Sequence, residues 1–208
     1  MFAVVIQTLS KDRFGKYLLA AGGDIDRAIR LVWNAHVGEA FHTPIQTVEV
    51  ALRNSINNAL VAKFGVEWWQ EPAFSRVVDV ERRQDLDTVK TRIKNRKQVL
   101  VTAQIVAGLS FGFWASMLQP RYNPEIWSGQ LRTSFPSLPA TESRHSLCEA
   151  ARDVGFLRNR ISHHEPIFER DLLKDFGSMM TLLGWVCPAT TSWIRPHCRV
   201  PALVRVKP

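Results

Sequence analysis

The chain has 208 residues, of which 46% are hydrophobic and 22% are charged. This length supports one well-buried core and is short for two, and the composition is that of a globular protein. Lys and Arg number 27 against 19 Asp and Glu, so the formal net charge is +8. Such an excess of positive charge favours polyanionic partners, nucleic acid first among them, or an acidic membrane surface.

The cysteine pattern indicates neither a disulfide framework nor a zinc knuckle. The three cysteines are Cys148, Cys187 and Cys198, with no Cys-x-x-Cys spacing. A reducing compartment, the cytoplasm, is therefore expected. The opening Met-Phe-Ala-Val-Val-Ile-Gln has no basic region before it and no cleavage site after it, so we do not expect a signal peptide.

Helix signals dominate the first part of the chain. Ser10 is placed to cap one helix and Asp24 a second, on either side of Gly22-Gly23. Thr43-Pro44-Ile45-Gln46 combines a capping-box spacing with proline at the first helical position. We therefore expect a new helix to begin at Thr43 and to end at Gly65.

The middle of the chain has a basic segment followed by an uncharged one. We expect the residues from about Asp79 to Lys97 and from Val99 to Leu118 to form one long helix or two consecutive helices. The uncharged stretch is long enough to span a bilayer. Its hydroxyl, amide and glycine residues favour a buried bundle helix instead, so no membrane partner is expected. Trp68 and Trp69, in the preceding connector, are expected in the core, with base stacking as the alternative.

Four prolines predict a loop region with short helices at about 120–139. Thr141 is then expected to open a helix with an apolar stripe facing the core. No strand alternation and no internal repeat is present. The predicted fold is therefore all-α, with a single domain over 1–208 that ends in a short basic tail. The stripe comprises Leu147, Ala150, Ala151, Val154, Leu157 and Ile161.

A second row on this helix has small side chains around one arginine. Ala151, Gly155, Arg158 and Ser162 fall within about 60° of one another on an ideal helix. Gly155 costs the helix roughly 1 kcal/mol relative to alanine, which indicates that another helix or a ligand approaches the backbone there. We place a two-fold interface on this row as a hypothesis.

The end of the same helix reads Arg158-Asn159-Arg160-Ile161-Ser162-His163-His164-Glu165-Pro166. Arginine offers a fixed fork of donors to phosphate oxygens, and imidazole gives and takes protons near neutrality. RNA carries its own nucleophile in the 2′-hydroxyl, so such residues can cleave it without a metal ion. The alternative is a capped helix end, because basic residues stabilise the exposed carbonyls there.

The geometry of this motif poses a difficulty. On an ideal helix His163 lies about 140° round from Arg158. The two side chains would face one site only if the last turn unwinds before Pro166, or if a second subunit completes the site. The sequence leaves both alternatives open.

The motif resembles the Arg-polar-(four to six residues)-His signature of the HEPN superfamily, small all-helical domains found in many prokaryotic ribonuclease toxins. Within it, the chain is most similar to the Abi-like (abortive infection) family. Three further segments resemble that family in the same order along the chain: Leu31 to Ala40, Val48 to Leu60 and Leu109 to Leu118. The resemblance therefore extends over most of the chain.

This resemblance implies an HEPN-type helical bundle that cleaves RNA without metal, generally as a homodimer whose motif helices line a shared cleft. Arg158 would then bind the scissile phosphate, and Asn159 would hold substrate or orient the site. His163 would be the acid or base. The role of His164 is open, and this residue suits a phosphate contact or the acid role. Glu165 either orients an imidazole or is simply exposed.

The predicted function is a metal-independent endoribonuclease, toxin-like in phage defence, with RNA as substrate and an antitoxin among its candidate partners. The alternative is an HEPN module that binds RNA or a protein without cutting it. Lys94, Arg96 and Lys97 lie in a basic run and are candidate contacts to the RNA backbone. A solvated helix face is the other interpretation of that run.

No cofactor and no metal site is expected. His145 and the run His163-His164-Glu165 offer metal-binding atoms, but no His-x-x-x-His spacing is present. His36 and His42 flank an expected helix end, where surface or capping roles are predicted for them.

Overall fold

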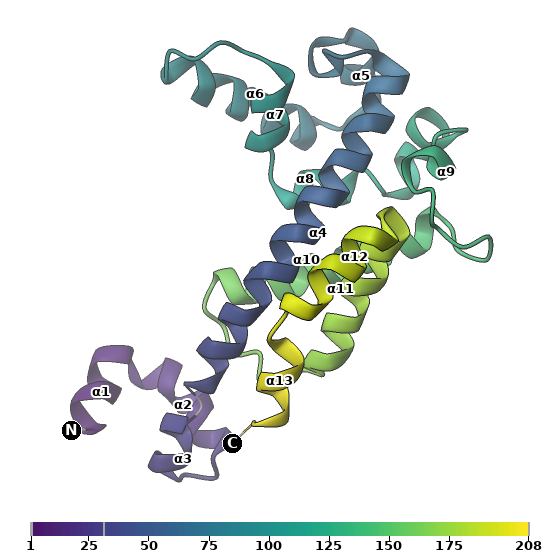
Figure 1. Cartoon of the computed structure of the whole chain (residues 1–208). Coiled ribbons are helices and arrows are strands. Elements are labelled where there is room, and N and C mark those ends of the chain that lie inside the picture. The colour runs from purple at the N-terminus through teal and green to yellow at the C-terminus, as the bar shows by residue number, and fades with distance from the viewer. Residues whose placement is uncertain (1, 31, 208) are drawn as a thin grey trace.

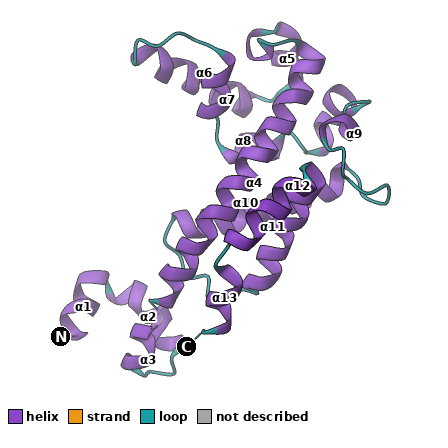
Figure 2. Cartoon of the chain, viewed as in Figure 1, coloured by secondary structure: helices purple, strands orange, loops and turns teal. Residues whose placement is uncertain are grey.

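The computed structural model describes residues 2–30 and 32–207. Within these ranges every regular element is helical and no strand occurs (Figure 2), which confirms the all-α prediction. The α-helices are α1 (Phe2–Leu9), α2 (Lys11–Ala20), α3 (Ile25–Arg30), α4 (Trp33–Phe64), α5 (Pro72–Val77), α6 (Val80–Asn95), α7 (Thr102–Gly108), α8 (Phe111–Ser116), α9 (Leu131–Ser134), α10 (Arg144–Ser162), α11 (Leu172–Val186), α12 (Pro188–Ile194) and α13 (Val200–Arg205). Short helical turns lie at Trp68–Gln70, Pro120–Tyr122, Asn123–Trp127 and Arg195–His197.

Helix α4 is the axis of the molecule. It is 32 residues long, and Figure 1 shows α1–α3 at one end of it, α5–α7 at the other, and α10 and α11 alongside. The last helices return over this body, since α12 packs on α11 and α13 packs on both α11 and α4. Val200 is buried, and the Leu203 carbonyl accepts a hydrogen bond from Nε1 of Trp33 at 2.8 Å. The residues expected to form a basic tail are therefore part of the packed helical body.

The predicted helix start at Thr43 is wrong. α4 begins at Trp33 and continues through Pro44 to Phe64. An interior proline removes one backbone hydrogen bond and costs a helix about 3 kcal/mol. Tertiary packing offsets that cost, because buried apolar side chains continue along one face on both sides of Pro44. They are Trp33, Val37, Phe41, Ile45, Val48 and Leu52. Gly65 ends the helix as predicted, with a φ of 88°.

The N-terminal helices form a small cluster of their own. The helix expected after Ser10 is α2, and Asp24 caps α3 as predicted, its carboxylate accepting from the Arg27 N–H at 3.0 Å. Phe14 and Ala21 are buried in this cluster. The residues before Ser10 form a further helix, α1, that the sequence analysis did not predict.

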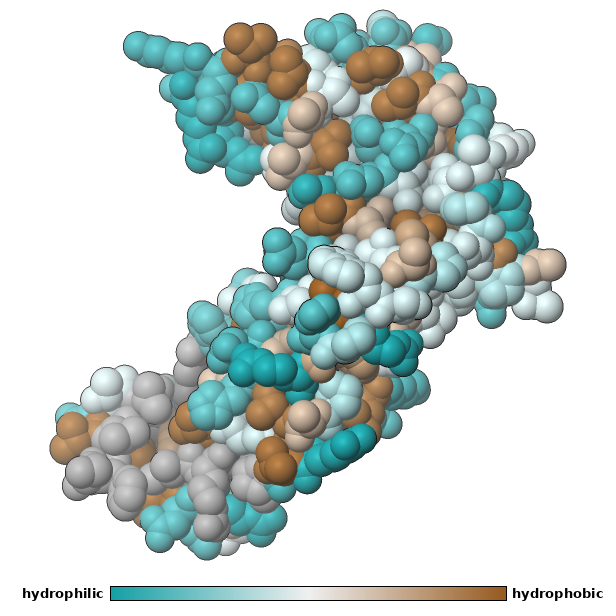
Figure 3. All heavy atoms as spheres, in the orientation of Figure 1, coloured by the Kyte–Doolittle hydropathy of each residue, from teal (hydrophilic) through white to brown (hydrophobic). Residues whose placement is uncertain are grey.

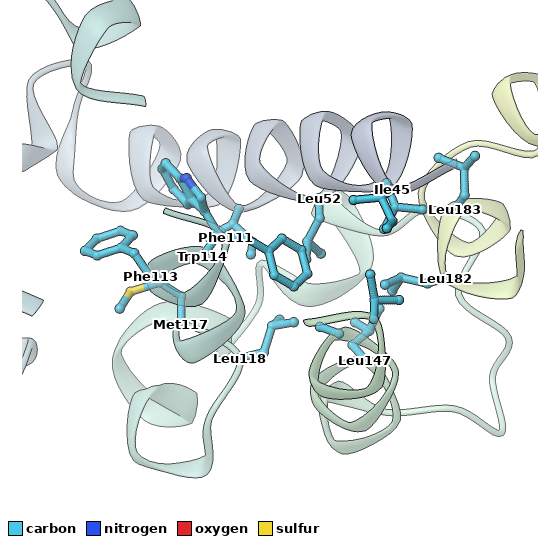
Figure 4. Close-up of a cluster of buried hydrophobic side chains, with 14 of the residues drawn as sticks. Ile45, Leu52, Phe111, Phe113, Trp114, Met117, Leu118, Leu147, Leu182 and Leu183 are labelled. Atoms are coloured by element: carbon cyan, nitrogen blue, oxygen red, sulfur yellow. The ribbon is translucent and has the colours of Figure 1, made fainter. Parts of the chain in front are cut away.

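The main core lies between α4, α8, α10 and α11. Figure 4 shows Ile45 and Leu52 of α4 with Phe111 of α8, Leu147 of α10 and Leu183 of α11 in one buried cluster. Burial of each such side chain contributes about 1.5–3 kcal/mol. This cluster therefore fixes how α10 lies against α4.

The uncharged stretch from Val99 to Leu118 is divided between two short helices, α7 and α8. The division falls at Ser110, whose Oγ caps α8 by accepting from the Phe113 N–H at 3.1 Å. No helix of the described residues is long and apolar enough to cross a membrane. Trp68 and Trp69 are buried, as expected of core residues. The region at 120–139 holds only short helices and turns, as predicted.

Candidate functional site

Helix α10 carries the Arg-Asn…His-His motif. Its cap is Ser143 rather than Thr141, because Oγ of Ser143 accepts from the His145 N–H at 3.2 Å and Oγ of Ser146 accepts from the Ser143 N–H at 3.3 Å. The predicted stripe packs inward as expected. Its fully buried members are Leu147, Ala151, Val154 and Leu157, and Ala150 and Ile161 pack against the core.

The motif ends in a tight C-terminal turn. His163 is the C-cap, and its N–H donates to the Asn159 carbonyl at 2.9 Å. The His164 N–H donates to the Ile161 carbonyl at 3.0 Å, and the Glu165 N–H reaches back to the Arg160 carbonyl at 2.8 Å. These two bonds define a Schellman motif, whose C′ residue adopts the left-handed conformation. That residue is His164, with a φ of 55°.

A histidine at this position is unusual, since glycine is the common C′ residue and a side chain there costs roughly 1–2 kcal/mol. Arg160 helps to hold the turn, with Nη2 donating to the Pro166 carbonyl at 2.7 Å and Nε lying 3.6 Å from Oε2 of Glu165. The left-handed residue turns the chain back across the helix end. His164 consequently lines a groove of about 510 Å³ together with Ser162.

This turn decides one of the two alternatives for the motif. The helix does not unwind early: α10 stays helical through Ser162. Ser162 lies one turn after Arg158 on the same side of the helix, and His164 shares the groove that Ser162 lines. His163 is exposed at the cap and is not among the residues that line that groove. Of the two motif histidines only His164 lines the groove, and Arg158 lies one turn before Ser162, outside the residues that line it.

Arg158 lies where α10 meets α4. Its Nε donates to Oε1 of Glu49 at 2.9 Å, and its Nη1 donates to Oδ1 of Asn159 at 3.3 Å. The side chains of Arg158 and Glu49 are 37% and 27% exposed. The guanidinium is thus restrained by a carboxylate and still accessible from solvent. Glu49 carried no signal of this role in the sequence, since the two residues are 109 positions apart.

The groove itself lies between the first turns of α4 and the end of α10. Gly38 of α4 faces Ile161 of α10, and a Cβ at Gly38 would make an ordinary van der Waals contact of 3.9 Å with Cγ2 of Ile161. The groove is lined on the α4 side by Glu39 and His42. A second cavity of about 380 Å³ adjoins it on the α2 side, and Tyr17, His164 and Glu165 line both.

His42 is exposed, as predicted, and it also lines the groove, which the sequence analysis did not predict. It was assigned a surface or capping role because a helix was expected to begin at Thr43. In the structure it lies within α4, seven residues before Glu49. Two helical turns place His42 and Glu49 on the same face of the helix. The seven-residue spacing between His42 and Glu49 would have indicated this face if the helix had been predicted to continue through Pro44.

The small-residue row of α10 is filled from within the chain. A Cβ at Gly155 would lie 3.1 Å from Cε1 of Phe111 on α8, and Ala151 is fully buried. The close approach that Gly155 indicated is therefore an intramolecular helix contact. Ala151 leaves no surface for a partner, whereas Gly155 is partly exposed and Ser162 is exposed, so the two-fold interface on this row stays a prediction.

The opposite face of α10 carries an exposed aromatic ring. Phe156 is 54% exposed. The guanidinium carbons of Arg170 and Arg160 lie 5.3 Å and 6.0 Å from its ring centroid. Arg170 is itself paired with Asp175, whose hydrogen bond raises the pKa of the guanidinium.

The candidate RNA-backbone residues Lys94, Arg96 and Lys97 are exposed at the end of α6. Arg96 lines an open depression of about 610 Å³ on that helix. Figure 1 shows α6 at the opposite end of α4 from α2, whose Tyr17 lines the histidine groove. Figure 3 shows many hydrophilic side chains at this end and a hollow between it and the body below. The structure thus keeps the basic run and the histidines apart.

Metal-binding groups are dispersed in the described part of the chain. Across residues 2–30 and 32–207, no three His, Cys, Asp or Glu side chains gather as a metal site requires. The three cysteines are free and partly buried.

Comparisons with known proteins give no match: no family model, no curated protein and no solved structure matches the chain. The resemblance to the Abi-like family therefore remains a prediction from the motif segments.

Proposed function

We propose that the chain is a metal-independent endoribonuclease in which Arg158 binds the scissile phosphate and His164 transfers a proton. The observation that carries this proposal is that His164, held in a left-handed backbone just after α10, lines the same groove as Ser162, which follows Arg158 by one helical turn. A strained non-glycine backbone persists only where the surrounding structure holds it in place, and such residues cluster at functional sites.

The chemistry fits the residues present. A guanidinium that is tethered at Nε and open to solvent offers its remaining N–H groups to phosphate oxygens, where arginine binds in a fork. An imidazole in an open groove exchanges protons near neutral pH. Asn159, which already accepts from Arg158, is placed to orient the guanidinium.

RNA is the proposed partner, and the net charge of +8 supports a polyanionic one. The homodimer stays part of the proposal, and the outward face of α10 is a second candidate interface beside the small-residue row. The exposed Phe156 marks that face, because exposed aromatic and arginine side chains are enriched in interfaces. A toxin-like role in the cytoplasm, with an antitoxin partner, is the biological setting that we propose.

The test is to incubate the purified protein with a mixed RNA pool in the presence of a chelator and to look for new ends that carry 2′,3′-cyclic phosphate. We expect Arg158→Ala and His164→Ala each to reduce cleavage by about 10² or more, as for a positioned acid or base. His145→Ala is the matched control, because His145 is exposed at the far end of the same helix.

Two outcomes redirect the proposal. If His163→Ala abolishes cleavage and His164→Ala does not, the proton-transfer role moves by one residue. If RNA binds but is never shortened, the chain is the alternative, a non-catalytic RNA-binding module.

A further inference from the structure

The groove at the end of α10 is lined by two imidazoles from different helices. His164 comes from the left-handed turn after α10, and His42 comes from α4. Both are exposed, so neither is held in the core by packing. The groove volume of about 510 Å³ is within the range of small-ligand sites.

Three other polar side chains of the groove are already engaged. Glu39 accepts from Nη2 of Arg199 at 2.9 Å, and Glu165 lies 3.6 Å from Nε of Arg160. Oδ1 of the buried Asn34 accepts from the backbone N–H groups of Ile167 and Phe168 at 2.7 Å and 3.1 Å. Tyr17 closes the groove from α2. The two imidazoles belong to the side-chain type that most often serves as acid or base in catalysis.

We infer that His42 is the second proton-transfer residue of the site and forms an acid–base pair with His164 within one chain. This inference rests on the proposed ribonuclease activity and extends it. Cleavage of RNA at the 2′-hydroxyl needs two such groups, because one proton must leave the nucleophile and another must reach the leaving oxygen.

The proposed cleavage involves two proton transfers. One imidazole, in its neutral form, takes the proton from the 2′-hydroxyl as the 2′-oxygen attacks phosphorus. The bond from phosphorus to the 5′-oxygen breaks, and the second imidazole, in its charged form, gives its proton to that oxygen. The products are a 2′,3′-cyclic phosphate and a free 5′-hydroxyl. Arg158, beyond Ser162 on the same side of α10, stabilises the charge on the phosphate oxygens.

The experiment compares His42→Gln, His164→Gln and the double variant with the parent over a pH series, on an RNA that the parent cleaves. The parent should give a bell-shaped dependence of kcat/KM on pH, which reports one essential acid and one essential base. Each single variant should lose about 10² or more in kcat and one limb of the bell, while RNA affinity stays near the parent value. The double variant should lose little more than either single variant, because the pair acts as a unit.

His36→Gln is the control, since His36 is exposed on α4 but outside the groove. If His42→Gln keeps the parent rate and both limbs while His164→Gln is inactive, the pairing inference fails and the proposed activity stands. If His164→Gln also keeps the parent rate, or the parent cuts no RNA, the proposed function fails with it. Thermal unfolding of each variant shows whether a loss of activity is a loss of fold.

Discussion

Oε1 of Glu49 accepts a hydrogen bond from Nε of Arg158 at 2.9 Å, and this contact joins the middle of α4 to the motif helix α10. The pair lies along α4 beyond His42, on the same face of the helix. Its members are partly exposed, so its contribution to the free energy of unfolding is about 1 kcal/mol or less. Its larger effect is on position, because the hydrogen bond holds the Arg158 guanidinium where α10 meets α4.

The first prediction concerns this pair. Glu49→Ala frees the Arg158 guanidinium, and we expect kcat for RNA cleavage to fall about tenfold with little change in stability. Glu49→Gln keeps an acceptor for Nε and should retain most of the activity. Single-turnover kinetics on both variants measure the effect. A rate above that of the parent in Glu49→Ala would show instead that Glu49 restrains Arg158 from the phosphate.

The second prediction separates stability from activity at His164. Glycine has no side chain to strain at a φ of 55°. His164→Gly should therefore stabilise the fold by about 1 kcal/mol, which corresponds to roughly 2–4 °C in Tm for a chain of this size. The same variant should lose cleavage, because it removes the imidazole.

Lys97 provides the matched control for that variant. It also has a positive φ, of 56°, at the end of a helix, and the Gln98 N–H reaches back to the Ile93 carbonyl at 3.2 Å. Lys97→Gly should raise Tm by a similar amount and leave the rate of the chemical step unchanged. Equal activity in the His164→Gly variant and the parent would remove His164 from the proposed site.

The third prediction tests where the small-residue row of α10 packs. Gly155→Leu places a side chain against the Phe111 ring, and overpacking of this kind costs about 1–3 kcal/mol. We expect a lower Tm, with partial recovery when Phe111→Ala is added to make room. Light scattering at a temperature where the variant is folded should show the oligomeric state of the parent. A fully folded variant that has only lost its dimer would show that the two-fold interface lies on this row.

The fourth prediction concerns stability at extreme pH. Asp79 caps α6 and accepts from the Arg82 N–H, from the Tyr122 hydroxyl at 2.9 Å and from Nη1 of Arg121 at 2.8 Å. Burial by itself raises the pKa of the Asp79 carboxyl. The hydrogen bonds and the arginine charges together lower this pKa by more than burial raises it, so the folded pKa lies below the ordinary value of 3.8. Burial and the Asp79 hydrogen bond raise the pKa of Tyr122 to about 12.

The lowered pKa of Asp79 and the raised pKa of Tyr122 make the fold less stable at both extremes of pH. The Asp79 contribution is fully present above pH 3.8 and is lost as the pH falls through the lower folded pKa. The Tyr122 contribution is lost as the pH rises from 10 towards 12. Tyr122→Phe should cost about 1.5–3 kcal/mol at neutral pH, as for a hydrogen bond to a charged group, and should flatten the alkaline loss. Denaturant unfolding of the variant and the parent at neutral and alkaline pH measures both effects.

Local signals in the sequence predicted the parts of the fold that local chemistry decides. The Asp24 cap, the end of α4 at Gly65 and the inward stripe of α10 depend on a few neighbouring residues each, and the structure confirms all three. The start of α4 does not depend on such signals. Proline at the position after Thr43 is a local helix-start signal, and burial of apolar residues on both sides overrides it.

The candidate site shows the same division. The Arg158 motif can be recognised in the sequence. Its partner Glu49 lies on another helix, and no local sequence pattern predicts a pairing between residues so far apart in the chain. The left-handed backbone of His164 was not predicted because glycine usually marks such a position. The place of His42 in the groove was not predicted because the helix was expected to begin at Thr43, which put His42 outside it.

The fifth prediction concerns the basic run at the end of α6. If Lys94, Arg96 and Lys97 contact the RNA backbone, their replacement by Gln weakens binding evenly across sequences. Each lost phosphate contact then lowers the slope of log affinity against log salt by about 0.7 for single-stranded RNA. We expect the triple variant to lose about two units of slope while kcat at saturating RNA stays near that of the parent, since this run lies far along α4 from the histidine groove. A triple variant at Arg27, Lys63 and Lys174, exposed cations on other elements, controls for net charge. Binding curves over a salt series decide the question, and equal slopes for the α6 variant and the parent would assign the run to solvated surface.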